Sequence, residues 1–177
     1  MDVFQIPLIL VPEDRKTIQI KLVAGAGEGD CRIKFPAIWL KRKKYLVLMI
    51  DKVYWHLLAQ YHTAELQSHT AELNRLYFKF NYNDVRYHRQ FRRWGSCSSL
   101  RNINLSHRLI GSPRQLQDYV ILHELAHLQH LNHGKEFWDL VATTGFIPKT
   151  IRKEIEIYGR DWQNSYYQWY HQILKSV

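Results

Sequence analysis

The chain has 177 residues, of which 46% are hydrophobic and 23% are charged. This composition is typical of one folded globular domain and excludes a largely disordered chain. Lys and Arg number 25 against 16 Asp and Glu, a net charge of +9, so the surface field favours anionic partners such as nucleotides, nucleic acids or acidic peptides.

The cysteine content and the hydropathy indicate the compartment. Cys31 and Cys97 are too few for a disulfide scaffold, so we expect reduced thiols and a cytoplasmic location. The apolar stretch 6–11 is short, contains Pro7 and lacks a basic start, which argues against a signal peptide. No run of about 18 apolar residues occurs in the sequence, so we expect no membrane partner. The oligomeric state is left open.

Residues 1–40 are predicted to form a β-hairpin region. Polar and apolar side chains alternate in TIQIKLV at 17–23, as in a half-buried strand, and residues 32–35 are the predicted returning strand. The intervening AGAGEGD at 24–30 is predicted to be the hairpin loop. It lacks the GK[ST] ending and the following helix that a phosphate-binding loop needs.

Residues 45–80 are predicted to form a long helix, because the stretch up to about Phe78 contains neither Gly nor Pro and is rich in helix formers. The pentapeptide HTAEL occurs twice within it, beginning at His62 and at His69. Two heptads are too few for a coiled coil. We therefore expect a packed helix with two partly exposed histidines; a dimer seam or a second metal site is the alternative.

A further helix has well-marked ends. Ser112 is the predicted N-cap, with Pro113 in the first turn and a glutamine at the capping-box position. The helix is predicted to run to about Leu131, and apolar residues cover much of its circumference, as in a buried helix. Two more helices are predicted at 135–144 and after Pro148.

The predicted buried helix contains an HExxH pattern at residues 123–127. Residues four apart share one helical face, so His123 and His127 can bind one ion, while Glu124, rotated by about 100°, can reach the water on that ion. Zinc lowers the pKa of its water to about 7, and a carboxylate then acts as the general base. Unpaired imidazoles on a buried helix are costly to desolvate, which favours a metal site over two core histidines.

A third ligand is needed, and His130, His133 and Glu136 are the candidates. His130 lies about 10.5 Å along the helix axis from His123, whereas ligand atoms on one zinc ion lie within about 4.2 Å of each other. His133 follows the predicted helix end, so the chain can turn and return it to the metal. We therefore favour His133, with Glu136 from the following helix as the alternative.

Four segments carry a resemblance to a known family: RRWGSCSS at 92–99, NINLSHRLI at 102–110, DYVILHELAHL at 118–128 and NHGKEFW at 132–138. They resemble the YgjP-like metallopeptidase family, which is related to SprT-like metalloproteases and other zincins. The resemblance covers the last half of the chain closely and the RKTIQIKL strand more loosely. It implies a zincin fold with His123, His127 and His133 as zinc ligands and Glu124 as the catalytic residue.

The resemblance also places the loop around Arg93 near the site. Arg93 is a candidate for stabilising an oxyanion or holding an anionic group of the substrate. The alternative is a structural turn in which Trp94 packs and Gly95 supplies backbone freedom. Tyr119 and Tyr158 are further candidates, as proton donors to an oxyanion.

The predicted function is a zinc metallopeptidase whose peptide or protein substrate lies along a strand at the cleft edge. An alternative on the same site is a metal-dependent nucleotide pyrophosphatase or phosphohydrolase, with the basic stretch 88–93 receiving the phosphates. A third hypothesis is a nucleic-acid-binding protein that uses its basic surface, including residues 41–44, and carries structural zinc. Structural zinc sites usually have four protein ligands, so three favour catalysis. Manganese, nickel or cobalt can also bind imidazole ligands.

The expected architecture is α+β and zincin-like, in a single domain over 1–177. It comprises the N-terminal β-hairpin region 1–40, the long helix 45–80 and a catalytic core at 85–160. A small, mostly antiparallel sheet is expected to pack on the long helix and on the metal-bearing HExxH helix.

Overall fold

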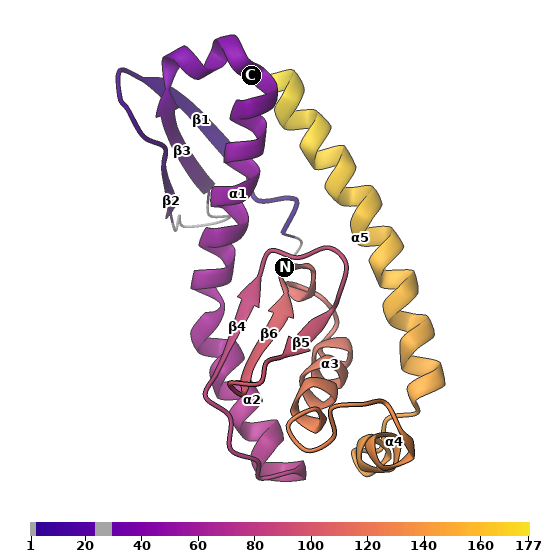
Figure 1. Ribbon diagram of the computed structural model, residues 1–177. Coiled ribbons are helices and arrows are strands. Elements are labelled where there is room, and N and C mark those ends of the chain that lie inside the picture. Colours follow the sequence, from indigo (N-terminus) through magenta and orange to yellow (C-terminus); the bar gives the residue numbers. More distant parts are fainter. Residues whose placement is uncertain (1–2, 24–29) are drawn as a thin grey trace. The chain divides into compact units, whose positions relative to one another are not determined.

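The computed structural model describes residues 3–23 and 30–177 (Figure 1). Residues 24–29, and with them nearly all of the predicted hairpin loop, lie outside the described residues. The described chain forms two compact units, one of Met1–Leu58 with Asp161–Val177 and one of Ala59–Arg160. The single domain over 1–177 stays a prediction.

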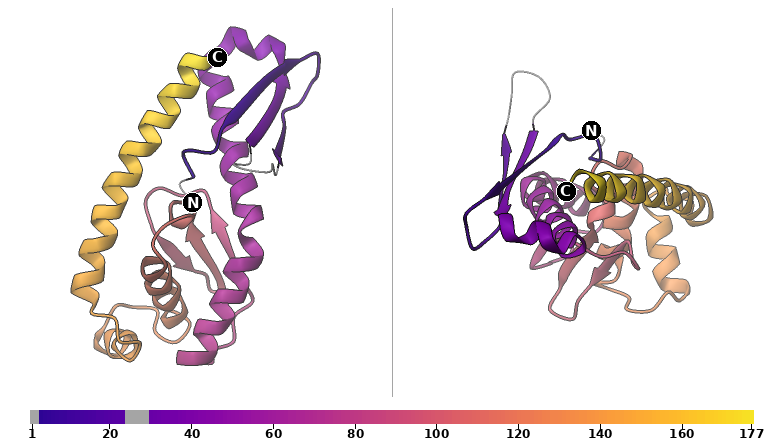
Figure 2. Two further views of the ribbon diagram at one scale, coloured as in Figure 1. Left: turned by 180° about the vertical axis from the view of Figure 1, so that it is seen from behind. Right: turned by 90° about the horizontal axis from the view of Figure 1, so that it is seen from above.

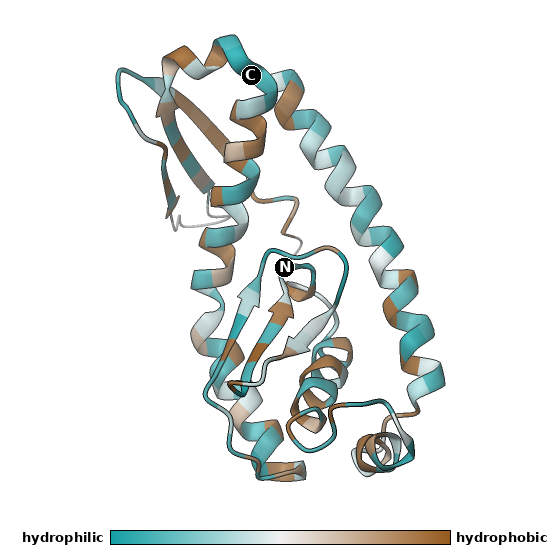
Figure 3. Cartoon of the chain, in the orientation of Figure 1, coloured by the Kyte–Doolittle hydropathy of each residue, from teal (hydrophilic) through white to brown (hydrophobic). Residues whose placement is uncertain are grey.

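The first unit contains a three-stranded sheet with the order β1-β3-β2. Its strands are β1 (Leu8–Glu13), β2 (Gln19–Val23) and β3 (Asp30–Pro36). β2 pairs antiparallel with β3, as predicted for the hairpin, whereas β1 pairs parallel with β3. Buried and exposed side chains alternate along β3, and its hydropathy alternates in the same way (Figure 3). The period-2 pattern therefore reports a sheet with one buried face.

Helices complete this unit. The 3-10 helix η1 (Ala37–Arg42) leads into α1 (Lys43–Tyr61), and the sheet lies beside the N-terminal half of α1 (Figure 2). The C-terminal half of α5 (Pro148–Ser176), the helix predicted after Pro148, belongs to the same unit and carries the aromatic segment NSYYQWYHQ at 164–172. Trp162 packs against Phe4 and Trp55 with ring centroids 5.4 and 5.6 Å away. These large rings form a core where a small sheet alone would bury little area.

The second unit contains another three-stranded sheet, with the order β4-β6-β5. Its strands are β4 (Asp84–His88), β5 (Gly95–Cys97) and β6 (Asn102–Ser106). β4 pairs parallel with β6, and β5 pairs antiparallel with it. Its helices are α2 (Thr63–Tyr77), the short 3-10 helix η2 (His107–Leu109), α3 (Arg114–Ala126), α4 (Lys135–Ala142) and the first part of α5. α3 packs on β5 and β6, while α2 contacts β4 and α3.

The α+β fold class is confirmed, but the sheets differ from the prediction. There are two sheets in the described chain, and each is mixed rather than mostly antiparallel. In each sheet, the strand that comes first in the chain pairs parallel with the strand that comes third. The strand that comes second in the chain lies at the opposite edge. Alternating hydropathy marks strands and their buried face but carries no information on strand direction, which depends on the connections.

The predicted long helix is interrupted. α1 ends at Tyr61 and α2 begins at Thr63, with His62 between them at φ −91° and ψ 2°. The Thr63 hydroxyl donates to the carbonyl of Ala59 at 2.7 Å. The sequence contains no Gly or Pro here, so helix propensity gives no sign of the break.

The two histidines of the repeated pentapeptide have different environments. His62 is partly exposed, as predicted, whereas His69 is only 8% exposed, so its predicted exposure is wrong. Its Nε2 pairs with the Asp118 carboxylate on α3. This hydrogen bond between two helices offsets the cost of burying the ring.

The predicted start of the HExxH helix is also wrong in its detail. Pro113 is the N-cap of α3, and the Ser112 hydroxyl instead donates to the carbonyl of Leu109 at 2.9 Å. The regular helix ends at Ala126 rather than near Leu131, with His127 as its C-cap. Among the described helices, none combines the length and the apolar character that crossing a bilayer requires.

Candidate active site

Three predicted ligands come together at the end of α3. His123 lies in the last turn of the helix, His127 caps it, and His133 lies in the loop that leads to α4. One ring nitrogen from each lies within 4.8 Å of the others, and the Nε2 atoms of His123 and His133 are 3.0 Å apart. The early end of the regular helix makes this convergence possible, because the loop can turn back toward the helix end.

The other two candidates for the third ligand, His130 and Glu136, lie outside this group of three histidines. His130 Nδ1 is 3.6 Å from the Glu136 carboxylate, so these two side chains pair with each other. The backbone of His130 nevertheless contacts the site: its carbonyl accepts a hydrogen bond from His127 Nδ1 at 3.0 Å. A carbonyl can only accept, so Nδ1 carries the proton and the lone pair of His127 Nε2 is free for a metal.

Aromatic side chains from the first turns of α4 hold the imidazole rings. Phe137, fully buried, stacks on His127 with ring centroids 4.6 Å apart and meets His123 edge-on at 4.9 Å. Trp138 stacks on His133 at 5.6 Å. Burial, and then the neighbouring histidines, lower the pKa of His123 to about 3, so the ring is neutral at pH 7. Neutral imidazole is the form that binds metals.

Glu124 lies beside the sheet and lines the same cavity as His123. It is 5% exposed, and a Cβ placed on Gly95 at the start of β5 would lie 2.6 Å from its Cγ and Oε1. The carboxyl group thus occupies the space that a side chain at position 95 would fill. Burial raises the pKa of Glu124 to about 8, and the charge of Arg93 opposes this shift.

The predicted role of Gly95 as a source of backbone freedom is therefore wrong. Gly95 is not among the glycines with positive φ, which are Gly111 and Gly145 in the described chain. A glycine is required at this position by the close approach of Glu124. Sequence patterns carry no signal for such a contact, because the two residues belong to different elements.

The predicted packing of Trp94 agrees with the structure. The Arg108 guanidinium lies 3.8 Å from the centre of one Trp94 ring, and Tyr158 lies on α5 with its ring 6.0 Å from the indole. The Tyr158 hydroxyl donates its hydrogen bond to the carbonyl of Arg108 at 2.8 Å. Its proton is therefore engaged in a structural contact. Arg93 itself is exposed and close enough for its charge to act on Glu124.

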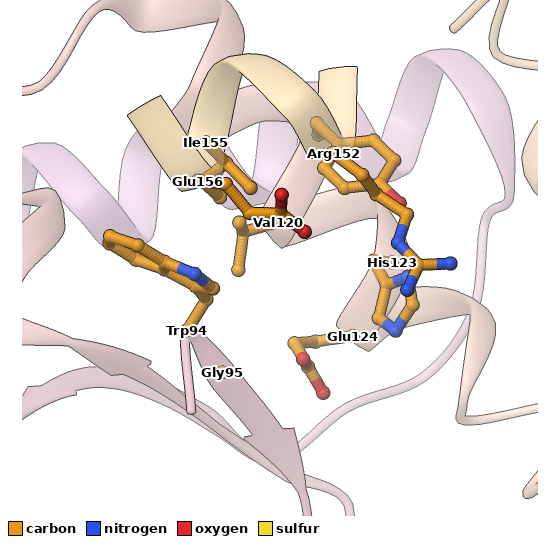
Figure 4. A pocket seen from close by; sticks show the side chains of 9 residues that line it. Trp94, Gly95, Val120, His123, Glu124, Arg152, Ile155 and Glu156 are labelled. Carbon is orange, nitrogen blue, oxygen red and sulfur yellow. The ribbon is translucent and has the colours of Figure 1, made fainter. Parts of the chain in front are cut away.

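A cavity of about 300 Å³ lies beside His123 and Glu124 (Figure 4). Residues of α3, the start of β5 and the first part of α5 line it. They are Trp94, Gly95, Tyr119, Val120, His123, Glu124, Arg152, Ile155 and Glu156. Sequence reasoning proposed Tyr119 but missed Arg152 and Glu156, which lie far along the chain on a helix with no motif. Burial raises the pKa of the Tyr119 hydroxyl, and the charge of Arg152 opposes this.

The donor set fits a transition metal. Three imidazoles suit zinc, copper, iron and nickel. Within residues 3–23 and 30–177, His123, His127 and His133 form the one group of His, Cys, Asp or Glu side chains compact enough to hold an ion. Three imidazole donors would leave a coordination position open on a bound ion, as in catalytic rather than structural zinc sites.

Residues 16–155 match the sequence pattern of a family described as YgjP-like, metallopeptidase domain. The chain belongs to the YgjP-like metallopeptidase family. Membership identifies this YgjP-like chain as a metal-dependent hydrolase. One solved structure, the metallopeptidase zymogen of Pyrococcus abyssi abylysin, is similar with 21% sequence identity and a TM-score of 0.43, covering 52% of this chain and 90% of that chain. No curated protein matches the chain.

Proposed function

We propose that this YgjP-like protein is a zinc metallopeptidase in which His123, His127 and His133 bind the ion and Glu124 is the general base. The observation that carries the proposal is the meeting of three imidazole nitrogens within 4.8 Å, next to a buried carboxyl group. The family supports a metal-dependent hydrolase, and the chemistry of the donor set supports zinc.

The side chains of this site are arranged for such a reaction. A bound zinc ion would supply Lewis-acid chemistry, polarising the scissile carbonyl and lowering the pKa of a water. The Glu124 carboxylate would take a proton from the attacking water as the carbon–oxygen bond forms. It would then deliver that proton to the amide nitrogen as the carbon–nitrogen bond breaks. The hydrogen bond from His127 to the His130 carbonyl keeps the ring oriented throughout.

The edge strand β5 offers a place for the substrate. β5 pairs with β6 on one side and lies at the end of the described sheet, so its other side can add a strand. Gly95, the first residue of β5, lies directly against Glu124. An extended peptide on this edge, bound through main-chain hydrogen bonds, would bring its carbonyl groups past the general base.

A second candidate is hydrolysis of a nucleotide or another phosphate ester at the same site. The exposed, basic segment 88–93 favours it, because the charge of Arg93 acts on Glu124. Cations placed at the attacked group stabilise the charge that develops on phosphate oxygens. The third hypothesis, structural zinc, is disfavoured by the lack of a fourth protein donor among the described residues.

Glu124→Gln tests the proposal, with Glu136→Gln as the matched control because Glu136 is exposed and outside the histidine group. Both variants should retain about one zinc per chain by mass spectrometry. Peptide turnover should fall by at least about 100-fold in Glu124→Gln, the usual contribution of a general base, and stay unchanged in Glu136→Gln.

The same assays on nucleoside triphosphates separate the two candidates. Turnover of nucleotides but not of peptides, lost in Glu124→Gln, would replace the first candidate by the second. Peptide turnover that survives Glu124→Gln would remove Glu124 from the mechanism.

A further inference from the structure

Two polar groups in the cavity beside His123 have no assigned role. The Tyr119 hydroxyl oxygen is buried and has no hydrogen-bond partner among the described residues. An unsatisfied buried hydroxyl is unfavourable, and such groups in native proteins usually serve a ligand, an ion or a water. Arg152 lines the same cavity, is exposed, and makes no hydrogen bond or ion pair with a described residue.

Arg152 lies close to the metal-binding end of the cavity. In Figure 4 its guanidinium lies beside His123, across the cavity from Trp94. Its positive charge acts on both Tyr119 and His123. A ligand group that is held by Arg152 and Tyr119 therefore lies in the same cavity as His123.

The cavity's charge disfavours a doubly charged phosphate. Arg152 is the one cation in the lining, whereas Glu124 and Glu156 are acidic. A guanidinium binds a carboxylate through two parallel hydrogen bonds, and the nearby acids oppose a second negative charge. Trp94, Val120 and Ile155 in the lining offer apolar surface that suits an apolar side chain.

Chain geometry relates this anion position to the cleaved bond. One extended residue spans about 3.3–3.6 Å, so a C-terminal carboxylate that follows the scissile bond by one residue reaches the cavity beside the metal site. An internal residue at this place would instead leave Arg152 and Tyr119 without an anionic partner.

We propose that Arg152 and Tyr119 bind the C-terminal carboxylate of a peptide whose last, apolar residue occupies this cavity. The Arg152 guanidinium donates two hydrogen bonds to the carboxylate, and the Tyr119 hydroxyl donates a third. The inference rests on the proposed metallopeptidase function and adds to it the substrate class: peptides that are cleaved next to a free C-terminus.

The first test compares peptides that differ only at the C-terminus, as the free acid or as the amide. Wild type should prefer the acid by about 10- to 100-fold in kcat/KM, mainly through KM, as expected for loss of a charge-assisted hydrogen bond. Arg152→Gln should abolish the preference and Tyr119→Phe should reduce it. Lys153→Gln is the matched control, because Lys153 is the exposed neighbour on α5 and does not line the cavity.

The second test measures binding without turnover. Calorimetry follows N-acetyl-leucine and N-acetyl-leucinamide on the full chain, both loaded with zinc and after chelation. The acid should bind both forms at least tenfold more tightly than the amide, and Arg152→Gln should lose this difference while Lys153→Gln keeps it. Binding that needs zinc and is unaltered in Arg152→Gln would mean that the ion holds the carboxylate, which would overturn the inference.

The two tests separate failure of the inference from failure of the proposed function. Equal cleavage of acid and amide by wild type would overturn the carboxylate site while leaving a metallopeptidase. Arg152-dependent binding of the acid without cleavage of any peptide would uphold the site and reject the peptidase. A preference for an internal Glu over Gln, with no effect of the C-terminus, would overturn the assignment to the terminal carboxylate.

Discussion

The carboxyl group of Glu124 lies against the backbone of Gly95, and this contact shapes the site at the scale of single residues. A buried carboxyl needs a defined position to exchange protons with a substrate. Gly95 provides that position by having no side chain, since any Cβ there would lie 2.6 Å from Glu124. The contact also brings the edge strand β5 close to Glu124.

Gly95→Ala should therefore lower peptide turnover by at least about tenfold, because a displacement of about 1 Å in a catalytic group costs up to about 100-fold. Zinc content should be unchanged, since Gly95 lies against Glu124 and not against the three histidines. Gly134→Ala is the matched control: nothing lies within 4 Å of a Cβ there, and its φ of −75° suits alanine. Full turnover by Gly95→Ala in steady-state assays would show that the close approach is not needed.

At the scale of secondary-structure elements, helical periodicity accounts for most of what the sequence predicts about the site. His123 and His127 share one face of α3 because the helix repeats locally, and His133 follows once the helix ends. The break at His62 has no signal in helix propensity, and the helix that follows it, α2, packs against β4 and α3. The parallel pairing of β1 with β3 was not predicted, because alternating hydropathy carries no information on strand direction.

The short helix η2, which follows β6, carries a histidine that should affect stability at acid pH. His107 is fully buried, and its Nδ1 accepts a hydrogen bond from the Gln90 N–H at 3.2 Å. Burial and then the charge of Arg89 lower its pKa to about 3, with a smaller contribution from Arg108; a hydrogen bond with the backbone of His88 opposes the shift.

Because the pKa of His107 is lower in the folded chain than in the unfolded one, the unfolded chain binds more protons between about pH 6.5 and pH 3. The free energy of unfolding should fall as the pH drops through this window, by up to about 1.4 kcal/mol per pH unit, and should not change above it for this reason. His107→Gln should reduce the slope in urea unfolding of the chelator-treated chain between pH 5 and 7.5.

His56→Gln serves as the control for this prediction, because His56 is exposed on α1. It should leave the slope as in wild type. The same slope in all three proteins would mean that His107 does not limit stability in acid.

At the scale of the whole molecule, the boundaries of the two compact units fall inside α1 and α5. No change in composition marks them, since a helix continues across each one. This is why the sequence predicts one domain without a linker. All three histidines of the candidate metal site belong to the second unit.

Zinc should stabilise the chain by binding the folded form, adding about 2.7 kcal/mol to the free energy of unfolding at 100 times its dissociation constant. Hydrogen exchange with and without chelator should show slower exchange at 127–138 when zinc is bound. His133→Ala should abolish the stabilisation. His130→Ala should retain it, because the carbonyl that accepts from His127 belongs to the backbone.

Equal stabilisation of His133→Ala and His130→Ala by zinc would exclude His133 as a ligand, and another donor would then be the third ligand. The comparison is matched, since both variants lose one imidazole from the same loop. Circular dichroism and thermal unfolding of the chelated proteins would check that neither change unfolds the chain by itself.

The sequence by itself determined the α+β class, the antiparallel pairing of β2 with β3, the helix that carries HExxH and the grouping of His133, rather than His130, with His123 and His127. These depend on local backbone geometry, in which the periods of helix and strand and the end of a helix relate residues that are close in the chain. Only the tertiary structure decided that Gly95 lies against Glu124 and that Arg152 and Tyr119 share one cavity. Such contacts join elements far apart in sequence, and they follow from how side chains pack, which no local pattern encodes.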